Sequence, residues 1–213
     1  TFHSNLTYAS ESGGLNESFS DIAGTLAEYF HEGDTADWDL GREVFRDPNG
    51  ALRYMCDPTR DGASIAHYSN YYEGMDVHYS SGLSNLAFCR TAKRFSSGEP
   101  EGNADVAGVR RAGQLWYLAN ASYWTASSTF RQGCQGTVDA ARALNYSELE
   151  IDQLKQSWMD AGIGCDGNEP PVQCDETLTG NDGTITSPNF PSDYPNNFRR
   201  TWCIDPSAEG PVT

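Results

Sequence analysis

Residues 15–30 read L-N-E-S-F-S-D-I-A-G-T-L-A-E-Y-F, a run in which large apolar side chains recur every three to four positions. This spacing predicts an amphipathic helix whose apolar face packs on a core. The apolar face consists of Phe19, Ile22, Leu26 and Phe30, and the opposite face carries Glu17, Asp21 and Glu28. An acidic stripe is typical of a solvated helix face. A carboxylate followed one turn later by a second one also suits a metal ligand with its orienting partner, so the pattern leaves both interpretations open.

Two further stretches carry helical periodicity. Residues 104–123 place apolar side chains at helical spacing, namely Val106, Val109, Ala112, Trp116, Ala119 and Tyr123. Ser147 and Glu150 form the S-x-x-E pattern of a capping box, which predicts that a helix begins there. The buried face of that helix is expected to consist of Ile151, Leu154, Trp158 and Ala161. We therefore expect residues 1–165 to form a mainly α domain.

Residues 31–80 lose regular periodicity and are rich in Asp, Gly and Pro. Long loops inside a compact domain usually serve a function or hold a metal ion. This loop and the helix before it contain an oxygen-rich group that suits a hard cation such as calcium. The group comprises Glu28, Glu32, Asp34, Asp37 and Asp39. The D-x-D-x-D-G pattern of an EF-hand is absent, and a plain charged loop is the alternative interpretation.

Asp76 precedes His78 by two residues. In an extended segment both side chains would project from the same face, where the carboxylate could orient and polarise the imidazole. The alternative is an exposed histidine that lies near a carboxylate by chance.

The composition changes near residue 165, where Pro, Gly, Asn and Thr become frequent. Residues 166–173, D-G-N-E-P-P-V-Q, are expected to form a linker, because two consecutive prolines cannot continue a helix and their neighbours are polar. Residues 174–213 contain turn clusters and short alternating runs, and residues 201–204 are typical of a strand. This last segment is too short for a β-sandwich of its own, so we expect a partial β domain.

Charge and cysteine content narrow the classes of function. The chain of 213 residues carries 14 Lys and Arg against 30 Asp and Glu, a net charge of −16, which argues against nucleic acid as a partner. No apolar run reaches the roughly 18 residues of a membrane span. Six cysteines without a C-x-x-C pair favour disulfides over zinc-finger or thioredoxin chemistry. Acidity and cysteine usage together indicate a secreted, extracellular protein.

Four separated segments occur in a recognisable order and spacing. They are S-N-L-T-Y-A-S-E-S-G-G-L-N-E-S-F-S-D-I-A-G (4–24), A-L-R-Y-M (51–55), Y-Y-E-G-M-D-V-H-Y-S-S-G-L-S-N-L-A-F (71–88) and L-A-N-A-S-Y-W-T-A-S-S-T-F (118–130). Together they resemble the thermolysin (M4) family of secreted zinc metalloendopeptidases, most closely its vibriolysin and pseudolysin branch. The resemblance implies that residues 1–165 form the helical C-terminal lobe of such a peptidase. It also implies that metal-activated water hydrolyses internal peptide bonds of protein or peptide substrates.

The resemblance assigns roles at the expected zinc site. In G-G-x-N-E-x-x-S-D the Glu is a zinc ligand, here Glu17, and the Asp orients a zinc-bound histidine, here Asp21. The His of D-V-H-x-S-S-G, here His78, would donate to the oxyanion that forms when water attacks the peptide carbonyl, with support from Asp76. Tyr8 would help to hold the same oxyanion. These roles agree with the chemistry, because a developing oxyanion needs a Lewis acid and hydrogen-bond donors.

The motif A-L-R implies two substrate contacts. Arg53 would bind a backbone carbonyl of the substrate, and Leu52 would lie beside the pocket for the residue after the cut.

The H-E-x-x-H helix that supplies two histidine ligands and the general base in such enzymes is absent. His31-Glu32 begins this motif but does not complete it. In relatives the helix ends shortly before the segment equivalent to residues 4–6, so we expect it upstream of Thr1 and expect the chain to be a fragment. Without two imidazoles, these 213 residues are expected to bind Zn²⁺ weakly and to be catalytically inactive.

The resemblance also implies a calcium site formed by Glu28, Asp37 and the carbonyl of Asp39. Thr25 stands where a pseudolysin-like protein has Glu, so a weakened or missing site is an alternative.

The cysteines are expected to form three disulfides. The resemblance implies that Cys134 pairs with Cys165. Cys56 and Cys89 have no counterpart in it, so they are paired with each other by subtraction.

Residues 174–213 resemble the opening of a CUB domain in the run G-T-I-T-S-P-N-F-P-x-x-Y-P. Its first disulfide would join Cys174 to Cys203. CUB domains are extracellular β-sandwiches that bind proteins or glycans, often through calcium. The alternative function is therefore a non-catalytic secreted binding protein with a peptidase-like lobe and a CUB module. Retention of all the site residues named above disfavours it.

Overall fold

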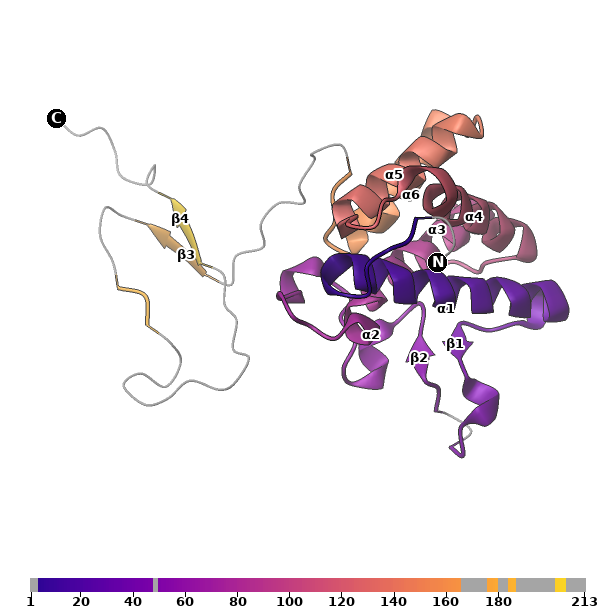
Figure 1. Ribbon diagram of the computed structural model, residues 1–213, viewed down its shortest axis with the longest axis horizontal. Helices are drawn as coiled ribbons and strands as arrows, with labels where there is room; N and C mark the ends of the chain where they lie inside the picture. Colours follow the sequence, from indigo (N-terminus) through magenta and orange to yellow (C-terminus); the bar gives the residue numbers. More distant parts are fainter. Residues whose placement is uncertain (1–3, 48–49, 166–175, 180–183, 187–201, 206–213) are drawn as a thin grey trace. The chain divides into compact units, whose positions relative to one another are not determined.

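The computed structural model describes residues 4–47, 50–165, 176–179, 184–186 and 202–205. The chain divides into two compact units, residues 1–170 and 171–213 (Figure 1). No helix in the described ranges is long and apolar enough to cross a membrane.

The first unit is mainly helical, which confirms the predicted fold class. Its α-helices are α1 (Ser10–Glu32), α2 (Val77–Ser80), α3 (Gly82–Ser97), α4 (Val106–Leu118), α5 (Phe130–Ala143) and α6 (Glu148–Asp160). The helix predicted over residues 104–123 therefore begins at Val106, and its last turn, Ala119–Tyr123, is π-helical.

Side-chain caps fix where several helices begin. Ser147 and Glu150 form the predicted reciprocal capping box of α6, which satisfies two backbone N–H groups at the helix start. Thr129 and Gln132 form a second capping box at α5 that the sequence analysis did not identify. At α4, the carboxylate of Asp105 accepts from the N–H of Gly108 at 2.7 Å. These caps explain why α4, α5 and α6 begin where they do.

The core is organised around aromatic side chains on α3, α4 and α6. Trp116 and Trp158 are fully buried and stack with ring centroids 5.5 Å apart and an interplanar angle of 9°. Phe88 packs edge-on against Trp116 at 5.5 Å. The two indole N–H groups donate to Ser84 and Thr137, each at 3.0 Å, so burial leaves neither donor unsatisfied. The predicted apolar face of α6 is buried as expected.

Helix α1 is covered on more sides than its sequence pattern predicts. Ile22 is buried and Phe19 and Leu26 are partly buried, as expected, but Phe30 is 92% exposed in the last turn, so that part of the prediction is wrong. On the opposite face, Asp21 is only 5% exposed, which excludes a fully solvated acidic stripe. The burial of Asp21 results from tertiary packing, because α1 contacts α3, α4 and α5 as well as α2 and β1.

The loop region between α1 and α2 is irregular, as predicted, and contains short 3-10 turns and one small sheet. Strand β1 (Asp39–Leu40) pairs antiparallel with β2 (Arg53–Tyr54), with Leu40 opposite Arg53. The disulfide Cys56–Cys89 ties this region to α3, and Cys134–Cys165 ties α5 to the residues after α6. Both pairings agree with the expectation.

In the second unit, strand β3 (Glu176–Thr179) pairs parallel with β4 (Trp202–Asp205), with Glu176 opposite Trp202. The strand expected near residues 201–204 is therefore present. The predicted linker, residues 166–173, lies outside the described residues, and so does Cys174 of the predicted Cys174–Cys203 bond. The CUB assignment stays a prediction.

Candidate functional site

Tyr8, Glu17 and His78 converge at one point although they come from three different elements. Tyr8 precedes α1, Glu17 lies in the second turn of α1, and His78 lies in α2. The Tyr8 hydroxyl donates to Glu17 Oε1 at 2.6 Å and lies 3.1 Å from His78 Nε2. Glu17 Oε2 lies 3.6 Å from the same nitrogen. A carboxylate, a phenol and an imidazole therefore face one another.

The glycine pair of the G-G-x-N-E segment permits this convergence. A Cβ at Gly13 would lie 2.4 Å from Cγ1 of Val77, and one at Gly14 would lie 2.5 Å from the ring of Phe130. Only glycine lets α2 and α5 approach α1 so closely at these positions. Because Gly13 and Glu17 are one helical turn apart, the same approach brings His78 to Glu17.

Asp76 holds His78, but not through the extended geometry that the sequence analysis assumed. Asp76 is the N-cap of α2, and its Oδ1 accepts from the backbone N–H of His78 at 3.0 Å. The same oxygen lies 2.7 Å from His78 Nδ1. Two hydrogen bonds lower the pKa of Asp76: the capping bond from the backbone N–H of His78 has the larger effect, and the bond to the imidazole ring has the smaller one. Because an ionised carboxylate only accepts hydrogen bonds, the proton belongs on Nδ1 and Nε2 faces Tyr8.

Tyr8 is kept protonated by its neighbours. The hydrogen bond to Glu17 is the largest cause of a rise in the pKa of Tyr8 to about 12. The segment that carries it is tied down, because Thr7 N–H donates to Ala126 O at 2.8 Å and the Asn16 amide donates to Leu6 O at 3.1 Å. The phenol is therefore a positioned donor throughout the neutral pH range.

Asp21, behind Glu17 on α1, is locked in a buried network. Arg53 on β2 binds both of its oxygens, through Nε to Oδ2 at 2.7 Å and Nη2 to Oδ1 at 2.5 Å. The amide of Asn85 on α3 donates to Oδ2 at 2.8 Å. These donors use three of the roughly four acceptor positions of a carboxylate, so room for one further donor is left.

Asn85 was not identified from the sequence. It is buried in α3. The available signal was a polar amide side chain inside the largely apolar stretch that follows S-S-G, where a buried amide needs a partner.

A hollow of ≈ 240 Å³ lies beside this network and next to His78. It is lined by Leu52, Arg53, Asp61, Ser64, Asp76, His78 and Tyr79. Leu52 is 54% exposed, so an apolar surface and a guanidinium border the same opening as the imidazole. The predicted substrate residues and the predicted catalytic residues are therefore adjacent.

The described residues supply only part of a metal site. Glu17 presents its carboxylate at the surface where Tyr8 and His78 meet, which fits one ligand of a metal ion. Within the described ranges, no group of three or more His, Cys, Asp or Glu side chains could hold a metal ion.

The residues expected to bind calcium lie near one another, but arginines contact them. Arg42 Nε lies 3.2 Å from Asp37 Oδ2, and the same guanidinium forms an ion pair with Asp39. Arg60 lies 3.6 Å from Asp39. The third expected ligand, Glu28, accepts from the backbone N–H of Asp37 at 3.4 Å. Burial is the largest cause of a raised pKa at Glu28.

The comparisons with known proteins agree with this arrangement. The family model for the thermolysin metallopeptidase alpha-helical domain matches residues 4–163. Hemagglutinin/proteinase of Vibrio cholerae is 42% identical over 170 residues, which are 80% of this chain and 26% of that protein. Zinc metalloprotease of Helicobacter pylori is 42% identical over 170 residues, 80% of this chain and 61% of that protein. The solved structure of the precursor of protealysin, a metalloproteinase from Serratia proteamaculans, gives a TM-score of 0.63 at 27% identity and covers 76% of this chain and 53% of that one.

The chain spans about a quarter of the length of its Vibrio relatives, 26% of the Vibrio cholerae protein and 29% of the virulence metalloprotease of Vibrio anguillarum. The matched residues include every side chain of the site described above. The chain therefore belongs to the thermolysin metallopeptidase family and contains its alpha-helical domain.

Proposed function

We propose that the complete protein is a zinc-dependent metalloendopeptidase and that this chain contributes one side of its catalytic site. The observation that carries the proposal is the convergence of Tyr8, Glu17 and His78 beside the hollow bordered by Arg53. Several relatives are named zinc metalloproteases, which supports the same reaction class.

In this proposal the carboxylate of Glu17, which accepts a hydrogen bond from Tyr8, would hold the metal ion. Zinc, when bound, would supply a Lewis acid that polarises a water molecule and the peptide carbonyl. The remaining ligands and the general base would come from an H-E-x-x-H segment outside these 213 residues. Asp21 has room for one further donor, which agrees with a role in orienting a ligand histidine.

His78 and Tyr8 are proposed to stabilise the oxyanion of the tetrahedral intermediate. Asp76 keeps a proton on Nδ1 and so orients the ring with Nε2 toward Tyr8 and Glu17. Nε2 would donate to the oxyanion in the imidazolium form, in which both ring nitrogens carry a proton. Removal of one oxyanion donor from a hydrolase typically costs about 10²–10³-fold in kcat. The single hydroxyl proton of Tyr8 is given to Glu17 in this structure, so Tyr8 would turn that proton from Glu17 to the oxyanion during the reaction.

Arg53 and Leu52 are proposed to position the substrate. The guanidinium is held by Asp21 on one side and borders the hollow on the other, where it can donate to a backbone carbonyl. Leu52 offers exposed apolar area to the side chain that follows the cut bond. Protein or peptide substrates therefore fit this surface.

Secretion, a CUB module and a calcium site are also parts of the proposal. Secretion is supported by the acidic composition and the two disulfides of the first unit. A CUB module in residues 174–213, and a protein or glycan partner for it, rest on sequence resemblance alone. Calcium at Glu28, Asp37 and the carbonyl of Asp39 has weaker support, because Arg42 is paired with the carboxylate of Asp37 and with the side chain of Asp39.

The 213-residue chain by itself is expected to show no peptidase activity and only weak zinc binding, because one carboxylate without imidazole ligands cannot hold zinc usefully. The complete protein is expected to hydrolyse casein, to lose that activity with 1,10-phenanthroline, and to regain it with added Zn²⁺. Both proteins would be assayed at equal concentration, and isothermal titration with Zn²⁺ would measure binding.

Casein hydrolysis by the 213-residue chain would refute the first expectation. A complete protein that is folded, loaded with zinc and unable to cut any peptide would refute the proposed function and favour the non-catalytic binding protein.

A further inference from the structure

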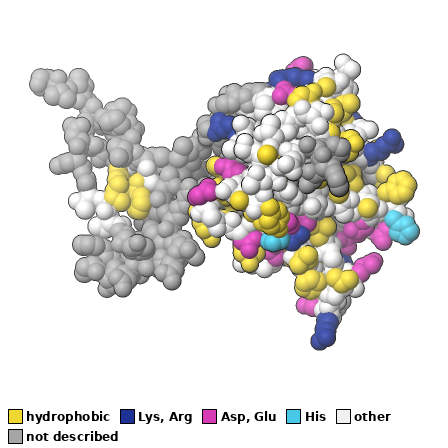
Figure 2. Space-filling model, in the orientation of Figure 1, with side chains coloured by type: hydrophobic (Ala, Val, Ile, Leu, Met, Phe, Trp, Pro, Cys, Tyr) yellow, Lys and Arg dark blue, Asp and Glu magenta, His cyan; other side chains and the backbone are white. Residues whose placement is uncertain are grey.

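An ionic cluster joins the C-terminal end of α1 to the loop that follows it. We define this cluster as Glu28, Asp37, Asp39, Arg42 and Arg60. It borders a hollow of ≈ 310 Å³ whose lining also includes Glu32 and Glu43. Figure 2 shows acidic side chains gathered where this end of α1 meets the projecting loop.

Both carboxylate oxygens of Asp37 and one of Asp39 are already bound by groups of the chain itself. Asp37 Oδ1 accepts from the backbone N–H of Asp39 at 2.7 Å, and Asp37 Oδ2 lies 3.2 Å from Arg42 Nε. Asp39 Oδ2 is paired with Arg42 and lies 3.6 Å from Arg60. Asp39 is well covered, with its side chain only 12% exposed. The guanidinium of Arg42 therefore lies between two carboxylates that could otherwise share a cation.

The backbone brings Arg42 into this position. Gly41 has φ 73°, a left-handed conformation that glycine adopts readily, and it turns the chain so that Arg42 folds back on Asp39 three residues earlier. Asp39 is held in place by strand pairing with Tyr54. The guanidinium carbon of Arg60 lies 4.2 Å from the centroid of the Tyr54 ring, which places Arg60 beside Asp39. Both arginines are thus held by local structure.

A calcium ion would require a different arrangement. Calcium takes six to eight oxygen ligands at about 2.3–2.6 Å and tolerates no cation among them. Arg42 is paired with the carboxylate of Asp37, an expected ligand, and Arg42 and Arg60 both contact the side chain of Asp39, whose carbonyl is another expected ligand. This positive charge would repel a divalent ion at the same place. The donor set of this chain therefore does not fit the calcium site that the family resemblance implies.

We propose that the guanidinium of Arg42 takes the place of a bound calcium ion, so that the loop is held to α1 by an internal cation. The fold of the first unit then needs no calcium. This proposal concerns the cluster alone and stands whether or not the complete protein is a peptidase.

Thermal unfolding and terbium luminescence of the 213-residue chain test the proposal. Tb³⁺ replaces Ca²⁺ at oxygen sites, and Trp38, between Asp37 and Asp39 in the sequence, would sensitise its emission. For the unsubstituted chain we expect the same Tm in EDTA and in millimolar Ca²⁺, and no saturable Tb³⁺ emission. For Arg42→Gln we expect a Tm lower by about 2–4 °C in EDTA, a rise on adding Ca²⁺, and saturable Tb³⁺ emission.

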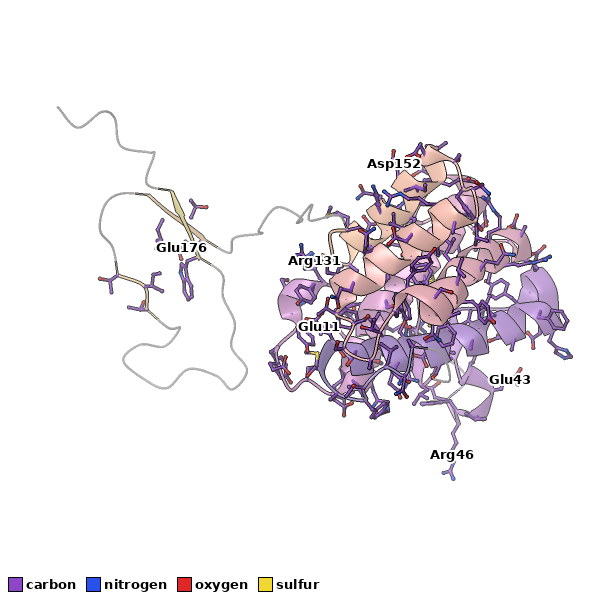
Figure 3. The ribbon with its side chains drawn as sticks, turned by 45° about the horizontal axis from the view of Figure 1, so that its top comes forward. Glu11, Glu43, Arg46, Arg131, Asp152 and Glu176 are labelled. Atoms are coloured by element: carbon purple, nitrogen blue, oxygen red, sulfur yellow. A yellow bond between two sulfur atoms is a disulfide. The ribbon has the colours of Figure 1, made fainter. Side chains whose placement is uncertain are left out.

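Arg46→Gln is the matched control. Arg46 belongs to the same loop but extends away from α1 at the loop tip, whereas Glu43 lies nearer the helix (Figure 3). Its substitution removes the same charge and is expected to leave both Tm and Tb³⁺ emission unchanged.

Saturable Tb³⁺ emission or a Ca²⁺-dependent Tm in the unsubstituted chain would overturn the proposal, and so would an Arg42→Gln variant with unchanged Tm and no response to Ca²⁺. If Arg42→Gln fails to fold, Arg42→Lys decides, because it keeps the charge: a folded, calcium-insensitive Arg42→Lys supports the internal cation, and a calcium-dependent one contradicts it.

Discussion

In the complete protein, Glu17→Gln is expected to lower kcat/KM for a peptide substrate by more than about 100-fold. Substitution of residues that only orient metal ligands costs up to about 100-fold, and loss of a ligand itself should cost more. The amide keeps the shape of the side chain and can still accept from Tyr8. It removes the negative charge that makes the carboxylate a zinc ligand. The zinc content of the purified variant is expected to fall together with activity.

Glu99→Gln is a suitable control for that experiment. Glu99 is exposed in the loop after α3, and its substitution removes the same charge at a position far from α1 in the sequence. Its activity and zinc content should match those of the unsubstituted protein. A Glu17→Gln protein that keeps full activity and full zinc content would show that Glu17 is not a ligand.

Asp21→Ala is expected to destabilise the first unit by about 3–5 kcal/mol, the range found when one partner of a buried ion pair is removed. Arg53 is only 16% exposed on its side chain, and its guanidinium would lose both hydrogen bonds to the carboxylate. The buried amide of Asn85 would lose its acceptor as well. Urea unfolding of the 213-residue chain, followed by tryptophan fluorescence, would measure the loss.

Two further variants test whether the loss of stability comes from the buried charge pair of Asp21 and Arg53. Asp152→Ala removes an exposed carboxylate from α6 (Figure 3) and is expected to change stability by less than about 0.5 kcal/mol. The double variant Asp21→Leu with Arg53→Leu leaves no buried charge without a partner and should be more stable than Asp21→Ala. A loss below about 1 kcal/mol for Asp21→Ala would contradict the account of this network.

Local signals predicted part of the helical framework and gave no helix at the places of α2, α3 and α5. The 3.6-residue spacing and the capping box located α1, α4 and α6 because their apolar faces and first turns depend on residues close in sequence. The tail strand near Trp202 was predicted from alternation for the same reason. Phe30 was misplaced because the pattern extends to the end of α1, whereas the burial of that end depends on which helices cover it.

The long-range contacts of the site could not be read from pattern. Periodicity suggested a solvated stripe, yet Asp21 is buried because Arg53 and Asn85, 32 and 64 residues away, converge on it. The partnership of Asp76 and His78 was expected, but its geometry was wrong because a capped helical turn replaces the extended segment.

The acidic loop after α1 shows the same limit of prediction from sequence pattern. The acidic residues were recognised as a group that suits a cation, and Arg42 stands in the printed sequence between them and Glu43. The spacing alone did not reveal that Gly41 turns the guanidinium back onto Asp39. Whether a carboxylate cluster binds a metal or an arginine depends on that backbone conformation.

The most direct test of the central claim is anomalous diffraction at the zinc edge from crystals of the complete protein. A zinc peak about 2.0–2.2 Å from a carboxylate oxygen of Glu17, with the phenol of Tyr8 and the imidazole of His78 facing the same space, is the result we predict. Zinc bound elsewhere, with the Glu17 carboxylate turned to solvent and remote from Tyr8 and His78, would contradict it.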